Sequence, residues 1–308
     1  MSSSRHPWPA ARARHRAAGR APSLARGRSV AGSQGRSLGR SLTRSLVAPV
    51  ALAALVSGCA ISTQREMELG ADFSNQINAQ LPLVNDPEAV RYVNVLGDSI
   101  ARVADDRNLD WRFFIVDSPE VNAFAIPGGF VYVNRGLIER TTSMAQLAGV
   151  LGHEIGHVVR RHSVKQMQAG QRLNFGVLLG CVLTAICTNG GDVAVGMAGN
   201  LAMASFSRGD EAESDQEAIR YVMRAGIDPR GVPEMFRILI RERSDRPTGG
   251  IDAWFRTHPM EEDRVRATEA TIAEFSKGSL DRLTRDTPRY QEFKRRLAAL
   301  PGATSRAR

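Results

Sequence analysis

The sequence is organised around residues 150–159, VLGHEIGHVV, which contain the pentapeptide HEIGH at positions 153–157. On an α-helix, residues four positions apart lie on one face, about one turn from each other. Two histidines at this spacing can bind a single Zn²⁺, and the glutamate between them then lies beside the water to be activated. We therefore predict His153 and His157 as metal ligands and Glu154 as the general base.

The flanking residues favour a helix for this stretch. Ser143 and Gln146 fit the S-x-x-Q pattern of a capping box. Apolar residues then recur at helical spacing, at Met144, Leu147, Leu151, Ile155 and Val158. The three candidate site residues fall away from the centre of that apolar stripe. The alternative, two surface histidines on an ordinary amphipathic helix, is weakened by further parts of a metal site elsewhere in the chain.

The net charge of +9 is concentrated at the N-terminus. Of the 41 lysines and arginines, ten are arginines in residues 1–58, which hold none of the 32 acidic residues, so the rest carry 31 basic against 32 acidic side chains. The high pI therefore comes from this leader. Because the remaining residues lack the basic excess of a nucleic-acid-binding protein, we predict no nucleic-acid partner.

Residues 1–58 are predicted to be a secretion signal of the lipoprotein type. The apolar run 46–56 is too short to span a bilayer and leads into VSGC at 56–59, which looks like a bacterial lipobox. Cys59 would carry the lipid, and Ala60 after it favours sorting to the outer membrane. We expect a bacterial periplasmic protein, anchored to the outer membrane through Cys59. The alternative is an ordinary signal peptide with an incidental cysteine.

Two further cysteines, Cys181 and Cys187, leave their pairing open. They could close a short disulfide loop in an oxidising compartment. Within one continuous helix, however, their side chains would point apart and could not bridge. Both lie in the apolar segment 175–206, which fits either a buried helical hairpin or a partly membrane-facing lid over the active site.

Between the leader and the central stretch we expect helices over 63–80 and 88–105 and a strand over 111–116. The following segment, 122–134, forms two extended pieces around the turn signal at 127–129. Its second piece consists of Phe130, Val131, Tyr132, Val133 and Asn134. We predict that this piece is an edge strand that binds an extended peptide substrate by strand addition. The alternative is an ordinary hairpin in the core.

A helix expected over 209–225 contains the candidate third ligand. Its apolar stripe, continued backwards, meets Glu211 and Asp215, and carboxylates on the buried side of a helix are costly unless their charge is compensated. A Zn²⁺ ion would compensate Glu211. Asp215, one turn further on, could accept a hydrogen bond from a ligating imidazole. Glu213 and Glu217 are expected to pair with Arg220 and Arg224 at the surface.

A second kind of zinc site is the longer metzincin motif, whose final histidine would fall at Ser163. His162 is one residue out of phase with that motif and falls on the apolar stripe. We therefore interpret His162 as a structural histidine and predict a zinc site of the glutamate type.

His258 lies in the segment 254–260, which is predicted to be a loop. In a zinc hydrolase such a histidine is a candidate for contacting the oxyanion or the metal, so we include it among the catalytic residues. The alternative is a solvent-exposed loop residue. Residues 281–300 are predicted to form a basic amphipathic helix.

Four segments resemble the M48 family of metallopeptidases, in particular its bacterial periplasmic lipoprotein and BepA-like members. They are NAFAIPGGFVYVN at 122–134, LAGVLGHEIGHVVRRH at 147–162, FSRGDEAESD at 206–215 and THPMEEDR at 257–264. The resemblance implies His153, His157 and Glu211 as zinc ligands, Glu154 as general base and an aspartate at 215 beside the third ligand. Ser214 stands where the family usually has alanine, and the tetratricopeptide repeats of the BepA-like members are not expected here.

We therefore predict an α+β protein, a mainly helical gluzincin-type metallopeptidase with a small β-sheet whose edge strand borders the active-site helix. The expected organisation is a signal at 1–58, a peptidase domain at 59–275 and a C-terminal helical tail at 276–308. The predicted function is a zinc-dependent endopeptidase with one Zn²⁺ per chain, acting on misfolded or unassembled envelope proteins. The alternatives are an envelope lipoprotein chaperone or scaffold with little proteolytic activity, and a zinc hydrolase of non-peptide amides.

Overall fold

The computed structural model describes residues 61–168, 206–245, 252–259 and 262–302. The predicted signal sequence, Cys59, the cysteines Cys181 and Cys187 and nearly all of the apolar segment 175–206 lie outside these residues. Among the helices of the described ranges, none combines the length and the apolar character needed to cross a lipid bilayer.

The described residues form one small sheet surrounded by helices. The strands are β1 (Arg112–Val116), β2 (Ala123–Ile126) and β3 (Phe130–Asn134). The helices are α1 (Thr63–Gln80), α2 (Pro87–Ala104), α3 (Arg135–Arg140), α4 (Met144–Val159), α5 (His162–Gln168), α7 (Arg208–Arg224), α8 (Gly231–Asp245), α9 (Asp252–Thr257), α10 (Glu262–Ala273), α11 (Lys277–Leu280) and α12 (Pro288–Ala299). The predicted mainly helical α+β fold with a small sheet is confirmed.

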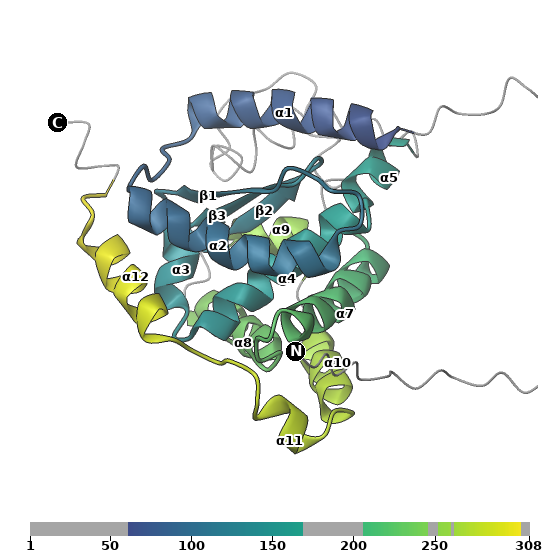
Figure 1. Ribbon diagram of the computed structural model, residues 1–308, viewed down its shortest axis with the longest axis vertical. Coiled ribbons are helices and arrows are strands. Elements are labelled where there is room, and N and C mark those ends of the chain that lie inside the picture. The colour runs from purple at the N-terminus through teal and green to yellow at the C-terminus, as the bar shows by residue number, and fades with distance from the viewer. Residues whose placement is uncertain (1–60, 169–205, 246–251, 260–261, 303–308) are drawn as a thin grey trace, which may run out of the picture. The chain divides into compact units, whose positions relative to one another are not determined.

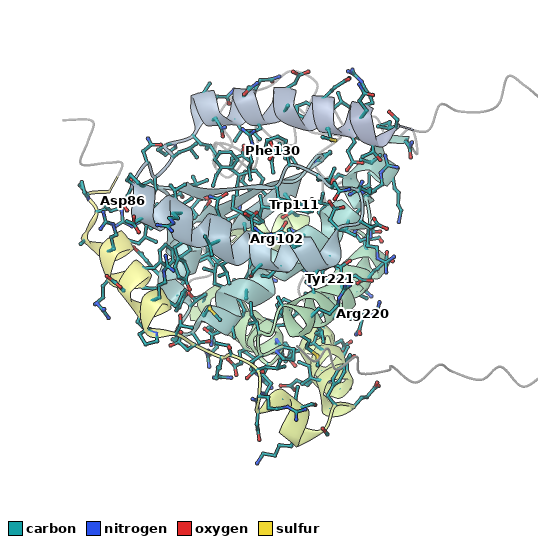
Figure 2. All side chains as sticks on the ribbon, in the orientation of Figure 1. Asp86, Arg102, Trp111, Phe130, Arg220 and Tyr221 are labelled. Carbon is teal, nitrogen blue, oxygen red and sulfur yellow. The ribbon has the colours of Figure 1, made fainter. Side chains whose placement is uncertain are left out.

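The sheet lies between two layers of helices. Helix α1 crosses one face of the sheet, and α2 and α4 cover the other (Figure 1). On the α1 side, Phe130 packs beneath the helix (Figure 2), and the buried hydroxyl of Tyr132 lies 2.9 Å from Ser74 Oγ and donates to Asn78 at 3.0 Å. Because both faces are covered, every residue of β3 is buried.

The strand order corrects one prediction. The order is β1-β3-β2, with β3 parallel to β1 and antiparallel to β2. Residues 130–134 therefore form the central strand, and the prediction that Phe130, Val131, Tyr132, Val133 and Asn134 form a peptide-binding edge is wrong. Their backbone groups are used on both sides in the ladder. The strand that faces α4 is β2, whose outer edge pairs with no other strand among the described residues and is called its free edge below. A turn in which Gly128 and Gly129 take φ values of 88° and 99° joins β2 to β3.

The C-terminal helix packs into the same core as the rest of the fold. Phe293 stacks on Tyr92 of α2 with ring centroids 4.5 Å apart, and Arg296 binds Asp86 at 2.6 Å, where Figure 2 places Asp86 beside α12. The predicted helix 281–300 begins only at Pro288, which follows the N-cap Thr287. Proline lacks a backbone N–H and is tolerated in the first turn of a helix but not in its interior.

Helix α4 is held by tertiary packing and not by the predicted capping box. Ser143 is the N-cap residue, but its side chain makes no capping hydrogen bond. Gln146 instead accepts from the backbone N–H of Thr142 at 2.8 Å and donates to Glu234 of α8 at 3.0 Å. The first turn of α4 also touches the first residue of α8, because Gly231 has no side chain to separate the two backbones.

This close approach predicts the effect of a single methyl group. A Cβ atom at Gly231 would lie 2.2 Å from the carbonyl oxygen of Ala145, whereas a Cβ at Gly278 of α11 would meet no atom within 4 Å. We expect Gly231→Ala to lower the free energy of unfolding by on the order of 1–3 kcal/mol. Gly278→Ala is the matched helical control and should leave stability unchanged or slightly increased. Urea unfolding measures both, and equal stabilities would contradict the packing described.

Candidate metal centre

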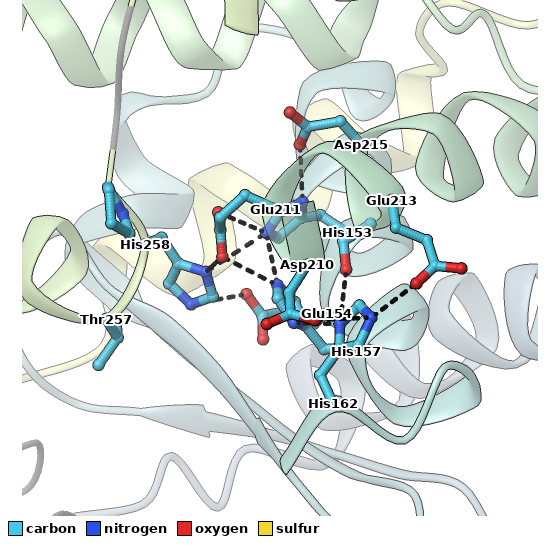
Figure 3. A network of polar contacts seen from close by, with 12 residues as sticks. His153, Glu154, His157, His162, Asp210, Glu211, Glu213, Asp215, Thr257 and His258 are labelled. Atoms are coloured by element: carbon cyan, nitrogen blue, oxygen red, sulfur yellow. Dashed lines mark hydrogen bonds and ion pairs between the residues drawn. The ribbon is translucent and has the colours of Figure 1, made fainter. Parts of the chain in front are cut away.

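The candidate site forms where α4 and α7 cross. Their backbones come close because α4 presents glycines to α7: a Cβ at Gly156 would lie 3.2 Å from Ser214 Cα, and one at Gly152 would lie 3.4 Å from Ala218 Cα. This crossing brings Glu211 and Asp215 of α7 beside the histidines of α4 (Figure 3). His258 follows directly after α9 and completes the group from a third segment.

Four buried side chains converge on one point. His153, His157, Glu211 and His258 each offer an atom, and these atoms all lie within 4.8 Å of one another. The Nε2 atoms of His153 and His157 are 3.0 Å apart, and His258 Nδ1 lies 3.3 Å from His153 Nε2. Glu211 contributes its carboxylate, with Oε1 3.0 Å from His258 Nδ1 and 3.3 Å from His157 Nε2. All three sequence-predicted ligands are thus together.

Hydrogen bonds behind the rings decide which atoms face this point. His153 Nδ1 lies 2.9 Å from Asp215 Oδ1, and a carboxylate can only accept, so Nδ1 carries the proton. When a cation replaces the second proton of this ring, Nε2 presents a lone pair. The nitrogens of the three imidazoles and the Glu211 carboxylate are ligand types that a zinc ion takes. A cation completes the cluster, so these residues fit a metal ion.

The electrostatics of the site agree with a cation-binding centre. Burial alone would lower the pKa of His153, but hydrogen bonds to Asp215 and Glu211 raise it to about 9. Burial lowers the pKa of His157 well below its ordinary value, so this ring is neutral and free to donate a lone pair. Although burial would raise the pKa of Glu211, the surrounding imidazoles, His258 first, hold it well below its usual value.

Glu154 lies beside the cluster, 1% exposed, without belonging to it. Burial raises the pKa of its carboxyl group, and the backbone of Ala125 in β2 hydrogen-bonds to it. Its Oε1 has no hydrogen-bond partner among the described residues and lies 3.6 Å from His258 Nε2. A buried carboxylate with a raised pKa and an unused lone pair has the properties of a general base.

The structure also reveals a residue that the sequence reasoning missed. Arg264 of α10 reaches the centre with Nη1 2.6 Å from Glu211 Oε2, while Nη2 and Nε bind the two oxygens of Asp215 at 2.7 and 2.8 Å. The two buried carboxylates are therefore compensated by this guanidinium, and not only by a metal as predicted. The spacing of apolar residues does not distinguish Arg264 from a surface arginine. The one indication in the sequence was its position in the segment 257–264, which resembles the M48 family.

His258 differs from its predicted surroundings. Residues 254–257 belong to α9 and are not a loop, and the backbone N–H of His258 still donates to the carbonyl of Trp254 at 2.8 Å. The side chain is 1% exposed, and Trp254 stacks on its ring at 4.5 Å. This burial excludes the interpretation of a solvent-exposed loop residue.

Helix α4 ends at Val159, so His162 is not part of its apolar stripe but opens α5. The His162 ring returns to His157, with the two Nδ1 atoms 3.0 Å apart, and its Nε2 lies 3.0 Å from Glu213. The expectation that Glu213 pairs with an α7 arginine at the surface is therefore wrong. Glu217 does bind Arg220 at 3.0 Å but is buried and not at the surface as expected, and Arg160 contacts both glutamates.

Comparisons with known proteins identify related chains. A model described as Peptidase family M48 matches residues 87–272. The "Beta-barrel assembly-enhancing protease" of Yersinia pestis is 33% identical over 218 residues, covering 68% of this chain and 44% of that protein. The protein of the same name from Escherichia coli (strain K12) is 32% identical over 219 residues, with the same coverage. "Metalloendopeptidase OMA1, mitochondrial" of Bos taurus is 29% identical over 171 residues, covering 53% of this chain and 33% of that protein.

The chain spans less than half the length of these relatives. The family match, however, extends over more than half of this chain and contains α4, α7 and His258, the segments whose side chains converge in the structure. The family resemblance seen in the sequence is therefore confirmed, and the chain belongs to peptidase family M48.

Proposed function

We propose that this chain is a zinc-dependent endopeptidase of the bacterial cell envelope that hydrolyses misfolded or unassembled envelope proteins. The observation that carries the proposal is the buried group of metal-ligand atoms from His153, His157 and Glu211, with Glu154 and the free edge of β2 beside it. Membership of a peptidase family and relatives named as proteases support the reaction class.

The donor set and its dimensions support zinc as the metal. Zn²⁺ takes nitrogen and oxygen ligands in a tetrahedron with bonds of about 2.0–2.1 Å, which places ligand atoms about 3.3 Å apart. Five separations among the candidate ligand atoms lie between 3.0 and 3.5 Å, and all of these atoms lie within 4.8 Å of one another. Two histidines and a glutamate are a common ligand set of catalytic zinc, with a fourth position for water or substrate.

Peptide hydrolysis at this site divides into separate tasks. Bound Zn²⁺ supplies Lewis acidity towards water and the scissile carbonyl. Glu154 accepts the proton of the attacking water at its unpaired oxygen and delivers it to the leaving amine. Because burial raises the pKa of Glu154, the protonated form needed for the second transfer is accessible. Asp215 keeps the proton of His153 on Nδ1 throughout.

The free edge of β2 provides a binding surface for an extended peptide. The backbone N–H of Asn134 donates to the carbonyl of Asn122, and hydrogen-bonded pairs alternate along an antiparallel ladder. The backbone groups of Ala123 and Ala125 therefore point away from β3, towards the free edge and Glu154. A substrate strand added here would pass the metal centre, as in other cases of β-strand addition.

The biological setting of the proposal rests on the sequence and the relatives. Two bacterial relatives are named for enhancing the assembly of β-barrels, and we extend that setting to this chain as quality control of envelope proteins. The alternative role of a chaperone or scaffold with little proteolytic activity requires the same fold. It does not require Glu154, so substitution of this residue distinguishes the two functions.

Glu154→Gln is expected to keep the fold and the bound zinc, because Glu154 is not among the converging ligand atoms. Loss of a general base should lower the rate of casein hydrolysis by about 10²–10⁴-fold. Glu68→Gln, at an exposed position of α1, is the control and should retain full activity. Casein hydrolysis by Glu154→Gln at the wild-type rate would contradict the assignment and favour a different base. Inactivity of the wild type itself on unfolded proteins would favour the scaffold.

His258→Ala tests the fourth position of the centre. Because His258 Nδ1 lies among the ligand atoms, we propose that its ring occupies the position that water or substrate must take. Its removal should then raise casein hydrolysis with zinc retained. If His258 instead donates to the oxyanion, its loss should lower activity by about 2.7–4 kcal/mol of transition-state stabilisation. A fall in activity with bound zinc unchanged would therefore reject the blocking role.

Cys59→Ser tests the proposed anchor, which the lipobox at 56–59 motivates. A lipidated Cys59 would hold the protein at the outer membrane, where lipid attachment supplies about 0.8 kcal/mol of membrane affinity per buried CH₂ group. The variant should appear in the soluble periplasmic fraction while the wild type sediments with membranes. Unchanged membrane sedimentation of Cys59→Ser would show that another part of the chain holds it there.

A further inference from the structure

A second histidine lies directly behind one of the candidate metal ligands. His162 is buried, 1% exposed, and its Nδ1 lies 3.0 Å from the Nδ1 of His157 (Figure 3). On the opposite side of its ring, Nε2 lies 3.0 Å from Glu213 Oε2 and 3.6 Å from Asp210 Oδ1. The three groups His157, His162 and Glu213 therefore form a chain that runs from the metal centre to the surface.

With both rings neutral, the contacts allow one arrangement of protons along this chain. A carboxylate can only accept a hydrogen bond, so Nε2 of neutral His162 carries its proton and donates to Glu213. Nδ1 of His162 is then an acceptor, and the proton between the two rings belongs to Nδ1 of His157. The hydroxyl of Ser214, 3.4 Å from the same His162 nitrogen, can donate to it and is compatible with this arrangement. Nε2 of His157 is left with a free lone pair that faces the metal centre.

The backbone turn between α4 and α5 holds His162 in place. Arg161, between the two helices, has a φ of 58°, a left-handed conformation that costs a non-glycine residue about 1–2 kcal/mol. The Arg161 side chain fixes the turn, because its guanidinium binds Glu66 at 2.7 Å and the backbone carbonyl of Ile61. Strain of this kind persists where the surroundings determine the conformation, often at functional sites. Here it turns the chain back so that His162 reaches His157.

The two α4 histidines are therefore oriented by different means. His153 Nδ1 lies 2.9 Å from Asp215, a buried carboxylate that Arg264 also binds. Behind His157 lies the His162 ring and, within the part of the chain that the structure describes, no carboxylate, so His157 reaches Glu213 through His162. Partners behind metal-ligating histidines typically fix the tautomer and the ring orientation, and their loss typically costs 10–100-fold in metal affinity.

We propose that His162, with Glu213 behind it, is a positioning residue that fixes the tautomer and orientation of His157 for metal binding. Glu213 selects the tautomer of His162, and His162 in turn selects that of His157. The inference rests on the proposed function, because it requires a metal at the centre. It assigns to His162 a role towards that metal without making it a ligand.

Zinc affinity of the full chain tests this role, measured by competition with a chromophoric chelator. His162→Leu keeps most of the side-chain volume but offers no acceptor, and it should weaken zinc binding by about 10–100-fold. His162→Asn offers an amide oxygen to His157 and should restore most of the affinity. Glu213→Gln should weaken binding by a smaller factor than His162→Leu, since an amide no longer forces His162 to donate.

Glu217→Gln is the matched control. Glu217 lies one turn further along α7 and shares the partner Arg160 with Glu213, but among its contacts is no residue of the metal centre. This variant should bind zinc like the wild type. Thermal unfolding of each metal-free variant shows whether it folds. If His162→Leu does not fold, the positioning role is tested by the zinc affinities of Glu213→Gln and Glu217→Gln, and equal affinities would reject it.

The outcomes separate this inference from the proposed function. If the wild type binds zinc and digests casein while His162→Leu binds zinc equally well, only the positioning role is rejected. Equal weakening in His162→Leu and His162→Asn would also reject it, because a purely structural role does not depend on a hydrogen-bond acceptor. A wild type that binds no zinc would overturn both the inference and the proposed metallopeptidase function.

Discussion

The crossing of α4 and α7 concentrates electron-pair donors and negative charge in the protein interior, and much of the surrounding structure compensates for that concentration. Three carboxylates, Glu154, Glu211 and Asp215, lie within this buried region, and among the described residues a single guanidinium, that of Arg264, accompanies them. At full ionisation they leave two formal negative charges. Uncompensated charge in a low-dielectric interior costs several kcal/mol per ion, so a divalent cation is the natural counterpart.

The compensation is arranged from the inside outward. Asp215 orients His153 and is itself held by Arg264, which also reaches Glu211. Behind His157, the His162 ring accepts a hydrogen bond from His157 and donates one to Glu213, whose side chain is 39% exposed and therefore solvated. The charge partner of one histidine is thus buried and paired, whereas that of the other lies near water. Neither arrangement leaves the imidazole free to rotate.

The sequence predicted most of the helices and the central site residues, because both depend on short-range spacing. The HEIGH pentapeptide fixes two histidines one turn apart, and the helix predicted over 209–225 corresponds to α7, Arg208–Arg224. Strand order was not predicted, because it depends on which segments meet in space. The apolar residues on both faces of 130–134 were a clue to a central strand, but they do not show which segments lie beside it.

Arg264 and the partner of His162 were missed for a related physical reason. Burial of a charged residue cannot be read from the residue itself, since arginine and glutamate on a polar helix are usually solvated. Glu213 lies two residues before Asp215 on the same helix. It meets a histidine only because the turn between α4 and α5 brings His162 to it. The left-handed Arg161 that makes this turn gives no signal in the sequence, because glycine or asparagine is the usual residue there.

The four candidate ligands differ in how firmly the fold holds them, and this difference bears on catalysis. His153, His157 and Glu211 come from two long helices whose backbones touch through glycines, so their mutual positions are fixed by packing. His258 follows the six-residue helix α9 and is held by the ring of Trp254 and by Glu211. A catalytic metal needs three permanent protein ligands and one exchangeable position. The three residues on the helices suit the permanent positions, and His258, whose removal disturbs no helix crossing, suits the exchangeable one.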